Sequence, residues 1–178
     1  VCAQTGWTTR LYDAFPEGLT KGVAAIEAFW DKGIERGKTT SDQKAEWLGN
    51  LRAVNDLAEA VEGADLVIEA VPESMQLKQD IFAELERLAP SHAMLATNTS
   101  GLPISEIAQS TGCPERVIGM HFFNPVPLMS LLELVRHDTA SEETIAAAQS
   151  IGSAMGKTTI VVRDVPGFAP SRLGAVLG

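Results

Sequence analysis

Short apolar runs alternate with longer segments of helical periodicity along the chain, as where DLVIEAV (65–71) precedes a helical pattern. Runs without polar alternation are typical of strands buried on both faces of a sheet, while apolar residues three and four positions apart predict helices. We expect strands at 8–13, 51–54, 65–71, 93–97, 117–121, 131–135 and 158–162. We expect helices at 16–36, from Thr40, from Asp56, and at 74–89, 102–108 and 141–155. This alternation predicts an α/β fold with a doubly wound, mostly parallel sheet.

Polar residues mark where two of these helices begin. Thr40 with Gln43, and Asp56 with Glu59, have the spacing of a capping box. In such a box two side chains satisfy two backbone N–H groups that the first turn of a helix leaves without partners. We therefore expect both pairs to be reciprocal.

A compact linker is predicted near the end of the sequence. The segment DVPG (164–167) combines turn residues, and the beginning of a further helix follows it. We therefore expect a domain boundary near Pro166. Residues 1–165 would form a partial dinucleotide-binding domain, and 166–178 would be the start of a truncated helical domain for substrate binding and dimerisation.

Composition narrows the possible functions. The net charge of −9 and the isoelectric point of about 4.8 argue against nucleic acid as a partner, because phosphate binding needs a basic surface. No apolar run approaches the roughly 20 residues of a membrane span. Cys2 and Cys113 stand alone, which argues against a disulfide framework and a metal site. We expect a cytoplasmic protein that binds no metal, membrane or nucleic acid.

An acid ends the first expected strand. In doubly wound dinucleotide-binding folds, an acid at the end of the second strand accepts hydrogen bonds from the adenosine ribose and repels a 2′-phosphate. Asp13 stands at such a place, and no Arg follows it closely, so NAD is favoured over NADP. The alternative is that Asp13 only caps the helix that begins near Pro16.

The glycine-rich loop that usually accompanies such an acid is missing. It is expected about 20 residues earlier, but only 12 residues precede Asp13. The loop and the first strand would therefore lie upstream of Val1. Because that strand normally lies between the two halves of the sheet, we expect the sheet to be split. We also expect this chain alone to bind NAD poorly, since the pyrophosphate lacks its helix N-terminus.

Polar segments follow several expected strands, where the ligand crevice of an α/β sheet lies. They are EAVPESMQLK (69–78), TNTSGLP (97–103) and GMHFFNPVP (119–127), with LLELV (131–135) shortly after. HFFNPVP after a strand, NTS some 20 residues before it and LLELV after it resemble the 3-hydroxyacyl-CoA dehydrogenase family. The resemblance covers essentially the whole chain. It implies oxidation of a 3-hydroxyacyl-CoA by NAD, or the reverse, as in fatty-acid β-oxidation.

The resemblance also implies a catalytic pair. His121 resembles the catalytic base, and a neutral imidazole can take the hydroxyl proton as the hydride leaves C3. Glu133 resembles the carboxylate that orients this imidazole, as the acid does in a Ser-His-Asp triad. The alternatives are a histidine hydrogen-bonded to a loop and a solvated strand acid.

Further residues are matched in the same way. Ser100 resembles the serine that bonds the substrate oxygen near the nicotinamide, and its alternative is a cap for the helix at 102–108. Asn124 resembles a residue near the nicotinamide ribose, and its alternative is a turn residue. Glu73 and Lys78 resemble cofactor-proximal residues, and their alternative is a solvated helix face.

One position departs from the family pattern. In GFAPSRL (167–173) this sequence has Ser171 where the family usually has Asn, so a hydroxyl would replace an amide in the active site. The resemblance further implies a homodimer in the full-length protein, formed through the helical domain. Two alternative functions stay open. One is a related NAD-dependent dehydrogenase acting on carnitine or a sugar acid, and the other is an inactive, truncated binding module.

Overall fold

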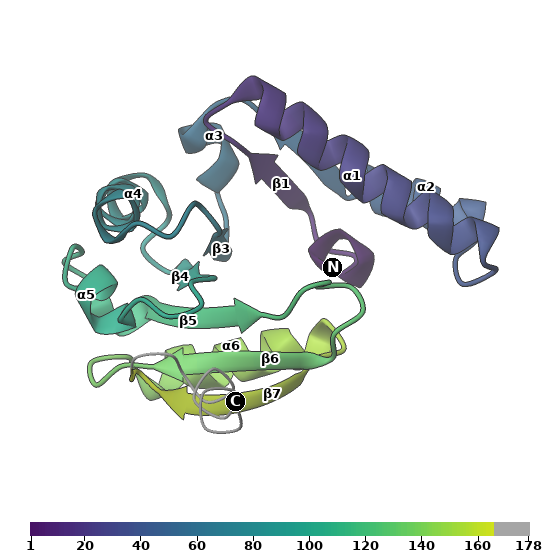
Figure 1. Ribbon diagram of the computed structural model, residues 1–178. Coiled ribbons are helices and arrows are strands. Elements are labelled where there is room, and N and C mark those ends of the chain that lie inside the picture. Colours follow the sequence, from purple (N-terminus) through teal and green to yellow (C-terminus); the bar gives the residue numbers. More distant parts are fainter. Residues whose placement is uncertain (166–178) are drawn as a thin grey trace. The chain divides into compact units, whose positions relative to one another are not determined.

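The computed structural model describes residues 1–165, which fall into two compact units (Figure 1). The first unit is Val1–Glu62 and the second begins at Gly63. Each unit has its own sheet, and no strand ladder joins the two sheets in the described residues. The expected split of the sheet is therefore confirmed. None of the helices in these residues combines the length and the apolar composition needed to cross a bilayer.

The first unit has a two-stranded parallel sheet, β1 with β2. Its elements are η1 (Cys2–Thr5), β1 (Thr9–Tyr12), α1 (Pro16–Glu35), α2 (Ser41–Gly49), β2 (Leu51–Val54) and α3 (Leu57–Val61). The indole rings of Trp30 on α1 and Trp47 on α2 lie 5.5 Å apart. Trp30 is buried, so this ring contact packs the two helices together.

Side chains cap two helices of this unit, although one cap differs from its prediction. The Thr40 hydroxyl accepts the N–H of Gln43, and the Gln43 side chain accepts the N–H of Thr40, which confirms the first capping box. The Asp56 carboxylate accepts the N–H of Glu59 at 2.9 Å. The Glu59 carboxylate does not return the contact. It pairs instead with the opposite charge of Arg52 on β2, at 2.6 Å. The prediction of a reciprocal capping box at Asp56 and Glu59 was therefore wrong.

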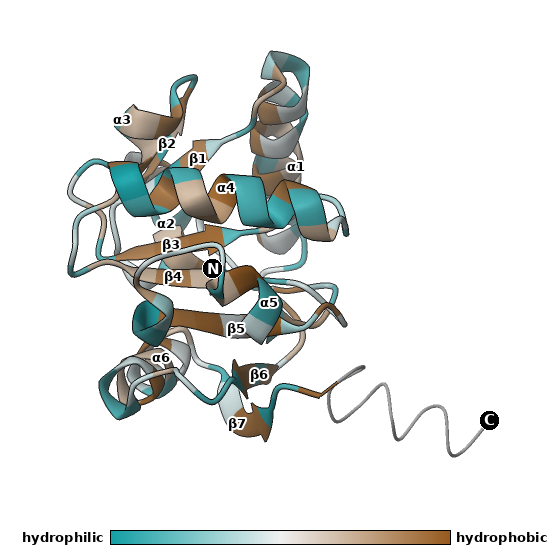
Figure 2. Ribbon diagram, turned by 90° about the vertical axis from the view of Figure 1, so that its left-hand side faces the viewer, coloured by the Kyte–Doolittle hydropathy of each residue, from teal (hydrophilic) through white to brown (hydrophobic). Residues whose placement is uncertain are grey.

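The second unit has a five-stranded sheet in the order β3-β4-β5-β6-β7. Its elements are β3 (Leu66–Glu69), α4 (Met75–Leu88), β4 (Met94–Thr97), α5 (Ile104–Ala108), η2 (Pro114–Arg116), β5 (Val117–Phe122), β6 (Leu131–Arg136), α6 (Glu142–Ala154) and β7 (Thr158–Arg163). A buried core includes Met120 of β5, Leu132 of β6 and Ala148 of α6. Figure 2 shows β5 mostly brown and α4 in both colours, as expected for a buried strand and a half-buried helix.

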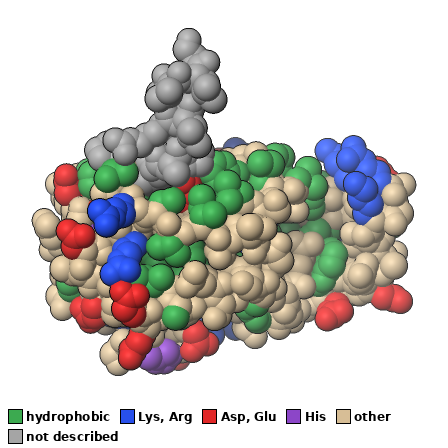
Figure 3. Space-filling model, turned by 90° about the horizontal axis from the view of Figure 1, so that it is seen from below, with side chains coloured by type: hydrophobic (Ala, Val, Ile, Leu, Met, Phe, Trp, Pro, Cys, Tyr) green, Lys and Arg blue, Asp and Glu red, His purple; other side chains and the backbone are tan. Residues whose placement is uncertain are grey.

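Strand direction changes once within this sheet. The strands β3, β4 and β5 run parallel, β6 runs antiparallel to β5, and β7 is parallel to β6. A parallel neighbour needs a crossover of about a dozen residues or more, and the loop 123–130 is too short for one. The mostly parallel sheet is thus confirmed, with one reversal that the apolar pattern did not predict. The outermost strand, β7, exposes 41% of Val161. Figure 3 shows hydrophobic side chains among acidic and basic ones on the face seen from below.

The beginning of α5 differs from its prediction. The helix starts at Ile104 rather than near residue 102, and no side chain of its own segment caps it. The carboxylate of Asp164 accepts the N–H groups of Ile104 at 2.9 Å and Ser105 at 2.7 Å. The alternative of Ser100 as the cap was therefore wrong. Two orphan N–H groups of α5 are satisfied by an acid 60 residues further along the chain.

We expect Asp164→Ala to lower the free energy of unfolding by about 1–2 kcal/mol, because it leaves both N–H groups without their acceptor. Urea unfolding measures the change. Asp138→Ala is the matched control. Asp138 is an exposed acid with no side-chain hydrogen bond or ion pair to any described residue, so its removal should change stability by less than about 0.5 kcal/mol. Equal effects of the two substitutions would contradict the cap.

Candidate active site

Polar residues of the second unit gather at one edge of its sheet. Glu69 ends β3 and lies opposite Thr97, the last residue of β4, and Thr97 in turn lies opposite Gly119 of β5. His121 follows Gly119 by two residues on the same strand. The carboxyl ends of the three parallel strands therefore meet at this edge, where ligands of α/β sheets bind.

His121 and Glu133 face one another across β5 and β6. They are opposite each other in the antiparallel ladder, and His121 Nδ1 lies 2.7 Å from Glu133 Oε2. The Glu133 side chain is fully buried, and the His121 side chain is 13% exposed. A neutral imidazole with its proton on Nδ1 would donate a hydrogen bond to this buried carboxylate. The alternative of a solvated strand acid was wrong for Glu133.

Asn98 holds the end of β5 and was missed by the sequence analysis. Its side-chain Oδ1 accepts the N–H of Phe122 at 2.8 Å, and its own N–H donates to the carbonyl of Glu69 at 2.8 Å. The side chain thus fixes the backbone directly after His121. An Asn after a strand is a signal for such a side-chain-to-backbone bond, but its partner, 24 residues away, could not be read from the sequence.

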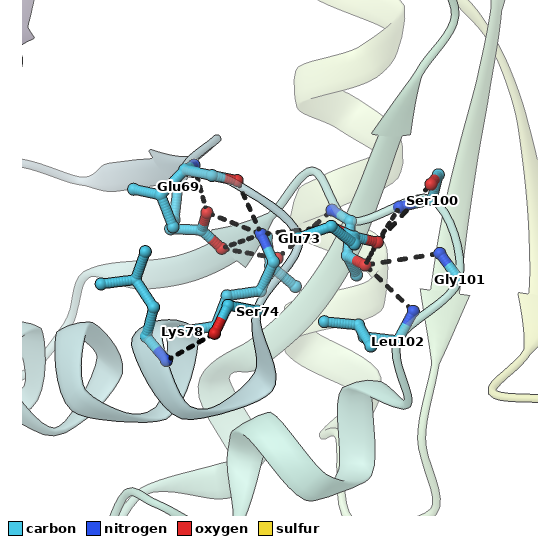
Figure 4. A network of polar contacts seen from close by, with 11 residues as sticks. Glu69, Glu73, Ser74, Lys78, Ser100, Gly101 and Leu102 are labelled. Atoms are coloured by element: carbon cyan, nitrogen blue, oxygen red, sulfur yellow. Dashed lines mark hydrogen bonds and ion pairs between the residues drawn. The ribbon is translucent and has the colours of Figure 1, made fainter.

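A buried ion pair lies beside this edge (Figure 4). Lys78 Nζ lies 2.8 Å and 3.1 Å from the two carboxylate oxygens of Glu69, with 1% and 2% of the two side chains exposed. The Glu69 carboxylate also accepts the hydroxyl of Thr97 at 2.7 Å and the N–H of Val71 at 2.5 Å. The solvated-face alternative was therefore wrong for Lys78. Glu69 was not among the predicted site residues.

Glu73 connects this pair to Ser100. Its Oε2 lies 3.6 Å from Lys78 Nζ, and its Oε1 accepts the hydroxyl of Thr99 and the N–H of Ser100 at 3.1 Å. The Ser100 hydroxyl also lies 3.5 Å from Oε1. Partial burial raises the pKa of Glu73, but the bonds from Thr99 and Ser100 and the charge of Lys78 outweigh burial and hold that pKa below its ordinary value.

The loop after His121 carries Asn124, which is exposed and precedes Pro125. Lys157 fastens this loop, because its ammonium donates to the carbonyls of Val126 at 2.5 Å and Met129 at 2.7 Å. Burial lowers the pKa of Lys157. Lys157 was missed, since a lysine after a helix ordinarily indicates a solvated charge.

Two further expected site residues are not among the described residues of the second unit. Asp13 belongs to the first unit, where its Oδ1 accepts the N–H of Phe15 at 2.8 Å just before α1. A Cβ on Gly18 would lie 2.5 Å from the other oxygen, so α1 approaches this carboxylate closely. The structural alternative for Asp13 therefore has support. Ser171 lies outside the described residues. Within residues 1–165, no group of three or more His, Cys, Asp or Glu side chains is placed to hold a metal ion.

Comparisons with known proteins find relatives in sequence and in structure. A family model described as "3-hydroxyacyl-CoA dehydrogenase, NAD binding domain" matches residues 1–165. A probable 3-hydroxybutyryl-CoA dehydrogenase of Bacillus subtilis is 42% identical over 96% of this chain, which spans 59% of that protein. The crystal structure of FadB2 from M. tuberculosis has a TM-score of 0.93 at 35% identity, over 96% of this chain and 60% of that one.

A second solved structure, (S)-3-hydroxybutyryl-CoA dehydrogenase from Ralstonia eutropha, has a TM-score of 0.93 at 33% identity. It covers 99% of this chain and 66% of its own. The chain spans 59% to 62% of the length of three curated dehydrogenases that it matches, and 22% to 24% of two larger fatty-acid oxidation proteins.

The lowered pKa of Glu73 predicts a pH dependence of stability. The folded state favours the ionised Glu73 carboxylate, which therefore contributes to the stability of the protein. This stabilisation is fully present above the ordinary pKa near 4.5 and is lost as the pH falls through the lower folded-state pKa. Glu73→Gln should therefore lower the unfolding midpoint at neutral pH, and the difference from wild type should shrink below about pH 4. Thermal unfolding between pH 3 and 7 measures it.

Glu84→Gln is the matched control. Glu84 is an exposed acid on the same helix, α4, and its side chain has no hydrogen bond or ion pair to any described residue. Its substitution should leave the midpoint nearly unchanged at every pH. A Glu73→Gln midpoint that tracks wild type across the whole range would refute the favourable contacts of Glu73.

Proposed function

The chain belongs to the 3-hydroxyacyl-CoA dehydrogenase family, and from this premise we propose that the whole protein is a dehydrogenase of 3-hydroxyacyl-CoA substrates. It would transfer a hydride between NAD and C3 of the substrate, in fatty-acid or butanoate metabolism. Residues 1–165 match the family's NAD-binding domain, so NAD is the cofactor. The observation that carries the proposal is the 2.7 Å contact between His121 and the fully buried Glu133.

The residue types present suit this cofactor. Asp13 is an exposed acid at the end of β1, able to accept hydrogen bonds from ribose hydroxyls. Glu73 keeps 42% of its side chain exposed, and Ser100 and Asn124 are exposed beside the carboxyl edge of the second sheet. When bound, NAD accepts the hydride that leaves C3.

His121 is the proposed general base. With the Nδ1 proton directed at Glu133, proton transfer takes place at Nε2, on the opposite side of the ring. In oxidation, Nε2 takes the proton of the C3 hydroxyl, and in reduction the imidazolium returns it. Glu133 keeps the ring in the tautomer with an unprotonated Nε2, and its charge stabilises the imidazolium. The ring of Phe123, 4.5 Å from the imidazole, further restricts its rotation.

The other roles follow from exposure. The Ser100 hydroxyl is proposed to bond the substrate oxygen, and Asn124 to lie near the nicotinamide ribose. Glu73 has enough exposed surface for direct contact with the cofactor. Lys78 is buried, so it is proposed to act on the cofactor through Glu73. The active-site role proposed for Ser171 falls outside the described residues.

We further propose that the whole protein is cytoplasmic, forms a homodimer and takes an acyl-CoA as its substrate. The names of its relatives support the substrate, since the Bacillus subtilis protein is named a probable 3-hydroxybutyryl-CoA dehydrogenase. Sedimentation equilibrium of the whole protein would distinguish a dimer from a monomer.

His121→Gln should lower kcat for acetoacetyl-CoA reduction by NADH about 100- to 10,000-fold, because general acid–base catalysis contributes on this order. The KM for NADH should change little. Initial rates of NADH absorbance change, measured with the whole protein, give both kcat and KM. Glu133→Gln should also lower kcat, since the amide no longer fixes the tautomer.

The matched control for this experiment is His92→Gln. His92 is 63% exposed and contacts Asp65, outside the proposed site. It should retain wild-type kcat. A His121→Gln rate within about threefold of wild type would mean that another group transfers the proton.

Asp13→Ser should raise the KM for NADH about tenfold or more, because a hydrogen bond to a charged group contributes about 1.5–3 kcal/mol. It should also weaken the preference over NADPH, since the charge that repels a 2′-phosphate is gone. Initial rates with both cofactors measure the change. Glu17→Ser, at an exposed acid in the first turn of α1, is the control and should retain the preference. An unchanged cofactor preference in Asp13→Ser would leave Asp13 as a structural residue only.

A further inference from the structure

A continuous series of polar contacts leads from the buried end of β3 to Ser100 (Figure 4). It starts at the Glu69 carboxylate, which lies 2.8 Å from Lys78 Nζ. Lys78 Nζ lies 3.6 Å from Glu73 Oε2, and Glu73 Oε1 accepts the N–H of Ser100 at 3.1 Å. Glu69 is therefore connected, through two charged side chains, to the residue proposed to bond the substrate oxygen.

The buried end of this series is fully satisfied. Both Glu69 oxygens accept hydrogen bonds, from Lys78, Thr97 and the N–H of Val71. Lys78 Nζ also donates to the Val71 carbonyl at 3.2 Å and forms an ion pair with Glu73 Oε2 at 3.6 Å. A buried ion pair with this many hydrogen bonds has few alternative arrangements. The ammonium is thus held in place beside Glu73.

The exposed end of the series depends on that distance. Packing does not fully enclose Glu73, because 42% of its side chain is exposed. Its position is set by Lys78 on one oxygen and by Thr99 and Ser100 on the other. Without the Glu69 charge, Lys78 would be an ammonium whose remaining charged partner is Glu73. The stronger attraction would draw the Glu73 carboxylate away from Ser100.

We propose that Glu69 is a positioning residue, which fixes Ser100 for catalysis through Lys78 and Glu73. This inference rests on the proposed function, in which Ser100 bonds the substrate oxygen. Glu69 touches neither substrate nor cofactor, since 2% of its side chain is exposed. It acts by balancing the charge of Lys78, which leaves Glu73 to hold the turn that carries Ser100.

A double-mutant cycle in the whole protein tests the inference. Glu69→Gln should lower kcat/KM for acetoacetyl-CoA about tenfold or more in the wild-type background. In a Ser100→Ala background the same substitution should cost less than about threefold, because its effect passes through Ser100. Equal losses in both backgrounds would overturn the proposal, since a general effect on the fold would be independent of Ser100.

A second variant covers the case in which Glu69→Gln does not fold. Glu69→Leu combined with Lys78→Met replaces the buried pair by apolar side chains of similar size, which often preserves stability. The far-UV circular dichroism spectrum and the urea midpoint identify folded variants. In this variant Glu73 loses the ammonium that lies beside one of its oxygens, so kcat/KM should again fall, and Ser100→Ala should again reduce the loss. Wild-type kcat/KM in the folded double variant would overturn the proposal.

A nuclear magnetic resonance measurement, which does not depend on enzymatic activity, separates this inference from the proposed function. The amide proton of Ser100 donates to a carboxylate, so its resonance should move upfield by several tenths of a ppm in Glu69→Gln. Glu84→Gln, on the exposed face of α4, should leave that resonance in place. An unmoved Ser100 resonance in Glu69→Gln would contradict the positioning role. Wild-type protein without acetoacetyl-CoA reductase activity would contradict only the proposed function.

Discussion

The site depends on the antiparallel pairing of β5 with β6, because this pairing places His121 opposite Glu133. The loop 123–130 is too short for a parallel crossover, and the antiparallel pairing brings His121 Nδ1 to 2.7 Å from the fully buried Glu133 carboxylate. Asn98 bonds the backbone at the end of β5, and Lys157 bonds the loop between β5 and β6. The proposed chemistry follows from the tautomer that the pairing imposes.

The end of β4 and the residues after it connect the parts of the site. Three consecutive residues each contact a different segment: Thr97 bonds Glu69 of β3, Asn98 bonds the end of β5, and Thr99 bonds Glu73, which precedes α4. The buried pair of Glu69 and Lys78 is joined to this stretch through Thr97. This short stretch therefore connects the histidine proposed as the base to the residues proposed to bind substrate and cofactor.

The sequence predicted the elements well because apolar runs and capping residues act locally, as at Thr40 and in β3. It did not predict contacts that join distant residues. The Asp164 cap of α5 spans 60 residues, and the direction of β6 depends on loop length rather than on apolar pattern. The burial of Lys78 was missed because lysine is almost always solvated unless a buried acid pairs with it. His121 and Glu133 were found through a motif resemblance. Their contact became visible only in the structure, because it depends on the pairing of β5 with β6.

The central claim is that Glu133 fixes the His121 imidazole with its proton on Nδ1, so that Nε2 is the base. Two-bond ¹H–¹⁵N correlation spectra of the histidine rings in the whole protein, near neutral pH, measure this tautomer directly. The account predicts a protonated Nδ1 and an unprotonated Nε2 for His121, and loss of this preference in Glu133→Gln. A neutral ring with its proton on Nε2 in the wild-type protein would contradict it.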